Sequence, residues 1–132
     1  RVARSGHALH VQALVPVPLH RRREAARGYN QACEIARFAG RQLGLPVLSG
    51  YVRRRRATVE QVGLGSLERA ENLRGAFELL RPLPVARVAI VDDVVTTGST
   101  AEELACVLRE GGAGWIECWS VARASLNPAR SA

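Results

Sequence analysis

Two adjacent carboxylates and a hydroxyl-rich turn are the residues whose types and spacing best support chemistry in this sequence. Asp92 and Asp93 directly follow the apolar run 88–91, which predicts a strand buried on both faces. A turn of small and hydroxyl-bearing residues comes next, and a helix is predicted over residues 101–109. The residues of this turn are Thr96, Thr97, Gly98, Ser99 and Thr100.

This arrangement predicts a site for a phosphorylated sugar. Because neighbouring strand residues point to opposite faces, both acids can serve one ligand only if the strand ends at Asp92. The turn offers backbone N–H groups, hydroxyls and the positive end of a helix, which together bind anions. A buried strand before an ordinary capped helix is the structural alternative. Paired acids with Thr-Thr-Gly at this spacing favour the phosphate site.

A basic loop follows the first predicted strand, residues 11–17. If that strand runs parallel to 88–91, the loop emerges at the edge of the sheet where ligands of open α/β sheets bind. Guanidinium groups suit phosphate oxygens and stabilise charge on a leaving pyrophosphate. A solvated charge run is the alternative, and the phosphate motif in the same chain favours the ligand site. The arginines concerned are Arg21, Arg22, Arg23 and Arg27.

Strands and helices are predicted to alternate along the chain. The strands cover residues 11–17, 46–53, 76–80, 88–91 and 115–121; the helices cover 29–43 and 101–109, and a loop with a helical turn spans 54–73. This order predicts an α/β fold with a mainly parallel sheet flanked by helices. We expect residues 1–10 to be a leader or linker, 11–123 one domain, and 124–132 a C-terminal tail.

Composition bounds the class of protein. The 132 residues are 47% hydrophobic and carry a formal charge of +7, and every one of the 19 basic residues is an arginine. That charge suits phosphates or nucleic acid, although 5% aromatic residues provide few platforms for stacking bases. No apolar run approaches the roughly 18 residues of a membrane helix, so no membrane insertion is expected. The three cysteines are spaced as free core thiols of a cytoplasmic protein.

The stretch 88–100 resembles the phosphoribosyl pyrophosphate (PRPP) signature of the class I phosphoribosyltransferases. Three ordered segments resemble the ComF (competence protein F) branch of that family more narrowly: 15–32, 58–77 and 88–100. The resemblance implies the class I phosphoribosyltransferase fold. It also implies an enzyme that transfers phosphoribosyl to an unknown acceptor, releases pyrophosphate and takes part in DNA uptake.

The resemblance assigns roles to particular residues. Asp92 and Asp93 match the acids that hold the ribose hydroxyls, close to a pyrophosphate-bound Mg²⁺, and Thr96 to Thr100 match the 5-phosphate loop. Arg22, Arg23 and Arg27 match the pyrophosphate loop. Thr58 and Gln61 fall in the segment that matches a flexible loop closing over the site, where closure excludes water.

Two features depart from the family pattern. Members usually begin with an N-terminal zinc ribbon built on cysteine pairs, so a ribbon removed from this sequence or a shortened member is expected. Thr96 stands where 6-oxopurine enzymes carry an aspartate as general base. Because a threonine cannot deprotonate a purine at neutral pH, a hypoxanthine or guanine transferase is disfavoured.

Two other classes of function stay open. One is a regulator that keeps the PRPP pocket as an effector site without transfer. The other is a single-stranded nucleic-acid-binding module that uses residues 21–27 and 53–56. Partners of the competence machinery and a homo-oligomer are further expectations. Trp115 and Trp119 share one face of the last strand with Glu117 between them, which indicates core or oligomer contact.

Overall fold

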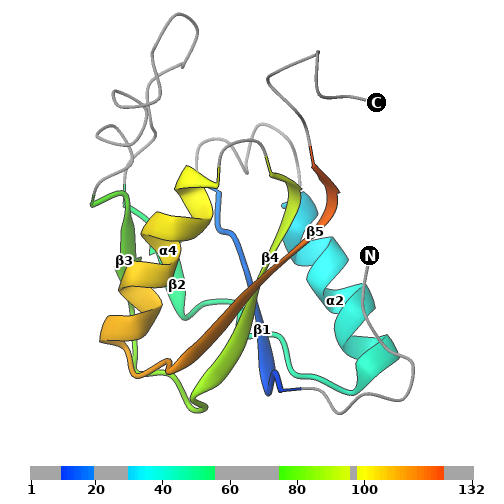
Figure 1. Cartoon of the computed structure of the whole chain (residues 1–132), viewed down its shortest axis with the longest axis horizontal. Coiled ribbons are helices and arrows are strands. Elements are labelled where there is room, and N and C mark those ends of the chain that lie inside the picture. The colour runs from blue at the N-terminus through cyan, green and yellow to red at the C-terminus, as the bar shows by residue number, and fades with distance from the viewer. Residues whose placement is uncertain (1–9, 20–29, 56–74, 96–97, 124–132) are drawn as a thin grey trace, which may run out of the picture.

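The computed structural model describes residues 10–19, 30–55, 75–95 and 98–123. Within them five strands and two helices form an α/β fold, as expected, although three strands follow one another between the two helices instead of alternating with helices (Figure 1). The strands are β1 (Ala13–Pro16), β2 (Val52–Arg54), β3 (Phe77–Leu79), β4 (Arg87–Val95) and β5 (Trp115–Arg123). The helices are α2 (Gln31–Leu43) and α4 (Ser99–Glu110).

The main sheet is parallel, and β4 lies at its centre. Its order is β1-β4-β5, with Val15 opposite Ile90 and Ile90 opposite Cys118. Residues 46–48 run along the free side of β1, because Leu14 N–H donates to Pro46 O over 2.9 Å and Leu48 N–H donates to Leu14 O over 2.7 Å. The predicted parallel sheet is therefore confirmed.

The predicted strand 46–53 divides between two sheets, which corrects the expectation of one continuous strand. After Leu48 the chain turns through Gly50, whose φ of 86° is a conformation that favours glycine. It then forms β2, which pairs antiparallel with β3 and places Arg53 opposite Glu78. The β2–β3 pair is thus a separate two-stranded sheet.

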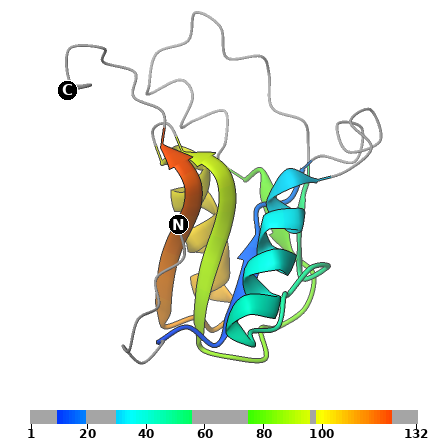
Figure 2. The same cartoon turned by 90° about the vertical axis from the view of Figure 1, so that its right-hand side faces the viewer.

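Alternation along β4 divides the core into two layers. Val88 and Ile90 pack with Leu104 and Leu108 of α4 and with Phe77 of β3. The intervening Ala89 and Val91 pack against α2. Figure 2 shows the consequence: α2 covers one face of the sheet, and α4 lies behind it on the other. Each fully buried Leu or Ile side chain contributes roughly 1.5–3 kcal/mol to stability.

Two of the three cysteines lie at the surface. None of the three forms a disulfide, as expected, and Cys33 is half-buried. Cys106 and Cys118 are exposed, so the prediction of core thiols is wrong for them. Cys106 follows the buried Leu104 and Ala105 but turns away from the sheet. Among the described residues, no helix is long and apolar enough to cross a membrane.

Gly40 is predicted to be sensitive to the smallest substitution. A Cβ atom there would lie 2.6 Å from Leu45 O and 3.2 Å from a methyl group of Val47, so α2 would have to move from residues 45–47. We expect Gly40→Ala to lower the free energy of unfolding by about 1–3 kcal/mol in urea denaturation. Gly114→Ala is the matched control, since nothing lies within 4 Å of a Cβ there. Equal stability of the two variants would contradict this packing.

Candidate functional site

The acid pair lies within β4 rather than beyond its end. The strand runs on to Val95 because β5 keeps pairing with it, with Asp92 opposite Ser120 and Val94 opposite Ala122. The prediction that the strand ends at Asp92 is therefore wrong. Because side chains alternate along a strand, Asp92 lies on the face of the sheet covered by α4 and Asp93 on the face covered by α2.

The two carboxyl groups nevertheless interact. The backbone N–H of Asp93 donates to Asp92 Oδ1 over 2.8 Å, and the two side chains share a hydrogen bond. Burial is the largest cause that raises the pKa of Asp92 from 3.8 to about 7. The bond to the Asp93 side chain and the negative charge of Asp93 raise this pKa further. Burial and the neighbouring Asp93 thus both oppose ionisation of Asp92.

The hydroxyl-rich turn leads directly into the N-terminus of α4. Gly98 is the N-cap with φ 86°, and Glu102 N–H donates to its carbonyl over 2.9 Å. Ser99 and Thr100 form the first turn of α4, so the helix begins two residues earlier than predicted. First-turn N–H groups have no partner within their own helix, which suits them to bind an anion. Two predicted phosphate-site residues therefore lie at a helix start.

Both ends of the basic loop are held beside the acid pair. Val17 N–H donates to Val91 O over 2.9 Å, next to Asp92 in sequence. Val17 O accepts from Asn30 Nδ2 over 3.1 Å, and Asn30 Oδ1 accepts from Cys33 N–H to cap α2. The loop thus leaves and returns at the carboxyl ends of β1 and β4. The chain leaves β1 toward residues 46–48 on one side of this strand pair and leaves β4 toward β5 on the other side. This point of the sheet is therefore a topological switch point.

Arg54 is a site residue that sequence reasoning missed. Its guanidinium lies over the Phe77 ring, 5.1 Å from the centroid, and its positive charge lowers the pKa of Asp92 against the effect of burial. Arg53 points the other way and forms an exposed ion pair with Glu78 at 2.8 Å. The alternation of the short strand β2 was the signal that separates these two arginines. Residues 53–55 therefore do not share one basic face.

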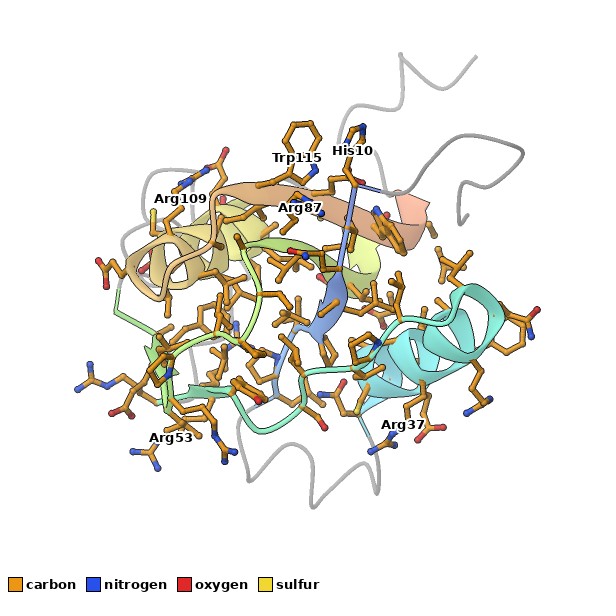
Figure 3. The ribbon with its side chains drawn as sticks, turned by 90° about the horizontal axis from the view of Figure 1, so that it is seen from below. His10, Arg37, Arg53, Arg87, Arg109 and Trp115 are labelled. Carbon is orange, nitrogen blue, oxygen red and sulfur yellow. The ribbon has the colours of Figure 1, made fainter. Side chains whose placement is uncertain are left out.

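A cavity of about 260 Å³ opens at the carboxyl end of β1. Apolar walls come from Pro16, Pro18 and Leu48, and polar groups come from Asn30 and Ser49. Arg37 and Arg53 also line it, and Figure 3 shows both on the side of the molecule away from Trp115. The cavity lies between the two ends of the basic loop, Leu19 and Asn30.

Several predicted site residues lie outside the described part of the chain. They are Arg21, Arg22, Arg23, Arg27, Thr58, Gln61, Thr96 and Thr97. Among the described ones, Asp92 and Asp93 interact directly, and Gly98, Ser99 and Thr100 form the N-terminal end of α4, which follows β4 in the chain. The charge of Arg54 acts on Asp92.

The acid pair offers only part of a ligand set for a divalent cation. Among the described residues, no group of three or more histidines, cysteines, aspartates or glutamates could hold a metal ion. Mg²⁺ is commonly held by one or two carboxylates together with substrate phosphates and water. Asp92 and Asp93 offer such a partial ligand set.

Fold and site together define a class: an α/β domain with acids and a helix N-terminus at the switch point of a parallel sheet. No family model matches the sequence. The chain is 42% identical over 128 residues to Competence protein F of Haemophilus influenzae, covering 94% of this chain and 56% of that protein. It is 41% identical over 110 residues to DNA utilization protein YhgH of Escherichia coli K12, covering 83% of this chain and 48% of that protein.

Over most of its length the chain is thus similar to Competence protein F and to the YhgH proteins, which confirms the resemblance to the ComF family. The DNA utilization protein YhgH of Salmonella typhimurium is similar to it at 40% identity. The chain spans about half the length of the curated relatives that it matches.

The raised pKa of Asp92 predicts that removing its charge stabilises the folded protein, by an amount that depends on pH. The folded protein holds a proton on Asp92 up to about pH 7, whereas the unfolded chain releases it near pH 3.8, so this residue costs stability as pH rises through that window. We expect Asp92→Asn to raise the free energy of unfolding at pH 8 by about 1–2 kcal/mol, a value discounted for solvent screening. Near pH 4 the gain should be much smaller.

Chemical denaturation at the two pH values checks this expectation. Glu110→Gln is the control for loss of one negative charge, because Glu110 is exposed at the end of α4. A loss of stability in Asp92→Asn at pH 8 would show that Asp92 is held as a favourable carboxylate.

Proposed function

We propose that this domain binds PRPP with Mg²⁺ and transfers its phosphoribosyl group to an acceptor with release of pyrophosphate. The observation that carries the proposal is the hydrogen bond from Val17 N–H to Val91 O. It fixes the start of the arginine-rich loop beside the acids, and the N-terminus of α4 follows those acids. Three ligand-binding features thus meet at one edge of the sheet, where α/β folds bind their ligands.

Each part of PRPP has a matching group in this arrangement. The 5-phosphate suits the first-turn N–H groups of α4 and the Ser99 hydroxyl. The ribose hydroxyls suit the Asp92–Asp93 pair, whose carboxylate oxygens can accept hydrogen bonds from them. The pyrophosphate suits the arginines of the loop between Leu19 and Asn30.

Catalysis would rest on positioning and charge stabilisation. The domain holds the anomeric carbon between the acid pair and the arginine-rich loop, so that pyrophosphate departs toward positive charge. Mg²⁺, when bound with the substrate, would neutralise the charge that develops on pyrophosphate. The negative pair beneath the ribose favours an oxocarbenium-like transition state over the neutral ground state.

The names of the similar proteins extend the proposal to a biological role. One is a competence protein and the others are DNA utilization proteins. We infer a role in DNA uptake or utilization for this chain, in which the acceptor is unknown. The arrangement of residues 53–55 favours the PRPP site over the nucleic-acid module, because Arg54 is turned inward against Phe77 and Arg53 is paired with Glu78.

Calorimetric titration with PRPP and Mg²⁺ tests the binding site. We expect Asp93→Asn and Asp92→Asn each to weaken binding by at least about tenfold, because a hydrogen bond to a charged group contributes about 1.5–3 kcal/mol. Glu110→Gln should bind like the unmodified chain. PRPP affinity that survives both substitutions would refute the site, whereas binding without pyrophosphate release for any acceptor would assign the domain as a regulator.

Arg54 provides a second test of the same site. Replacing it by methionine keeps an apolar contact with Phe77 but removes the positive charge that favours ionised Asp92. We expect Arg54→Met to move the Asp92 pKa above about 7, measured by NMR titration, and to weaken PRPP binding more at pH 7 than at pH 8.5. Arg109→Met is the control, because Arg109 is exposed in the last turn of α4, at the end of that helix away from the site. Equal effects of the two variants would remove Arg54 from the site.

A further inference from the structure

The outer strand β5 has an apolar side that no described helix covers. Trp115 and Val121 are 45% and 62% exposed, and Trp119, between them on the same side, is partly buried against the α2 layer of the core. Figure 2 shows this face of the sheet, with α2 in front of β1 and without a described helix in front of β5. Strands of a parallel sheet are ordinarily covered on both faces.

The neighbouring flank of α2 is apolar as well. Gly40 contacts Val47 and Leu45, which places it on the flank that faces away from β5. Ile35 and Phe38 lie on the opposite flank by helical periodicity. Ile35 packs against the same core layer as Trp119, and Phe38 is 58% exposed. We call these residues the apolar strip: the exposed Phe38, Trp115 and Val121, together with the partly buried Ile35 and Trp119.

Hydrogen bonds within β5 fix this strip and mask its one acid. Glu117 accepts from Trp115 Nε1 at 2.7 Å and from Trp119 Nε1 at 2.9 Å, one bond to each carboxylate oxygen. The His10 ring lies 5.1 Å from the Trp115 ring, and Figure 3 shows the two side by side at the edge of the molecule. The indoles are thus held in place, and their polar atoms are satisfied before anything docks.

We propose that this strip is the docking site for one amphipathic helix, supplied by the part of the polypeptide that the longer relatives have outside the region matched here. The chain spans 56% and 48% of the first two relatives, which leaves ample length for such a helix. A helix parallel to α2 at the usual 8–10 Å would cover β5 and bury Phe38, Trp115 and Val121 together.

Two other occupants fit the strip less well. A second copy of this chain would bring together two molecules of formal charge +7, and pairing β5 edges would leave the sheet face bare. A nucleic-acid strand needs cations along its path. Arg87 at one end of the strip instead donates from Nε to His10 O, and the strip itself carries Glu117.

The two tryptophans of the chain, Trp115 and Trp119, both belong to this face, so intrinsic fluorescence reports on it alone. The test titrates the 132-residue chain with fluorescein-labelled 20-residue peptides that tile the unmatched part of Haemophilus influenzae Competence protein F. We expect a peptide with apolar residues at i, i+3, i+4 and i+7 to bind with a Kd of the order of micromolar. Tryptophan emission should then shift to shorter wavelength as Trp115 leaves water.

Matched variants decide whether the strip is the site. Val121→Glu and Phe38→Glu should each weaken this peptide by about tenfold or more, whereas Leu80→Glu, an exposed apolar position next to β3, should change it less than about twofold. Circular dichroism checks that each variant is folded. Absence of a binding peptide, or binding that Val121→Glu leaves unchanged, would overturn the proposal.

Two further measurements separate the alternative occupants. If a second copy occupies the strip, sedimentation will show a dimer, and Val121→Glu will return it to a monomer. If a nucleic acid binds there, oligothymidine will quench the tryptophan fluorescence, and Val121→Glu will abolish the quenching. Either result would assign the strip to that other partner and overturn the helix.

Discussion

The parallel pairing of β1 with β4 is the constraint on which the rest of this domain depends. It buries Val15 and Ile90 between the layers, and its last hydrogen bond joins Val17 to Val91. Beyond that bond the two strands carry opposite charges: an arginine-rich sequence follows β1, and β4 contains the two aspartates. After β1 the chain goes on to residues 46–48 on one side of the strand pair, and after β4 it goes on to β5 on the other side. The segments that follow β1 and β4 therefore diverge from each other. The strand order therefore leaves open the edge of the sheet at the carboxyl ends of β1 and β4.

Ionisation of Asp92 is unfavourable at this edge of the sheet. Asp92 is half-buried beside Asp93, and Arg54 compensates only in part, so the pKa of Asp92 remains near 7. A cation or a hydrogen-bond donor placed beside Asp92 would therefore stabilise its ionised form against the effect of burial. The burial of Ile90 and Leu104 supplies the stability that keeps the two acids together.

Much of this arrangement could be predicted from the sequence. The apolar run 88–91, the helix around Ile35 and the strand that carries Trp115 and Trp119 have strong periodicity, and each was found. The continuation of β4 to Val95 could not be predicted, because pairing with β5 overrides the local preference of two aspartates for a turn. The inward orientation of Arg54 depends on the position of Phe77, 23 residues along the chain. The division at Gly50 likewise reflects which strand each half of the segment meets.

The β2–β3 pair has a consequence for how such domains can diversify. Arg55 N–H donates to Ala76 O over 2.6 Å, and Gly75 N–H donates to Glu103 over 3.1 Å, so residues 55 and 75 are fixed to the body of the domain. Once the ends of a connection are fixed, doubling its length costs only about 0.6 kcal/mol of closure free energy. Natural selection can therefore lengthen, shorten or exchange the residues between these anchors with little loss of foldability.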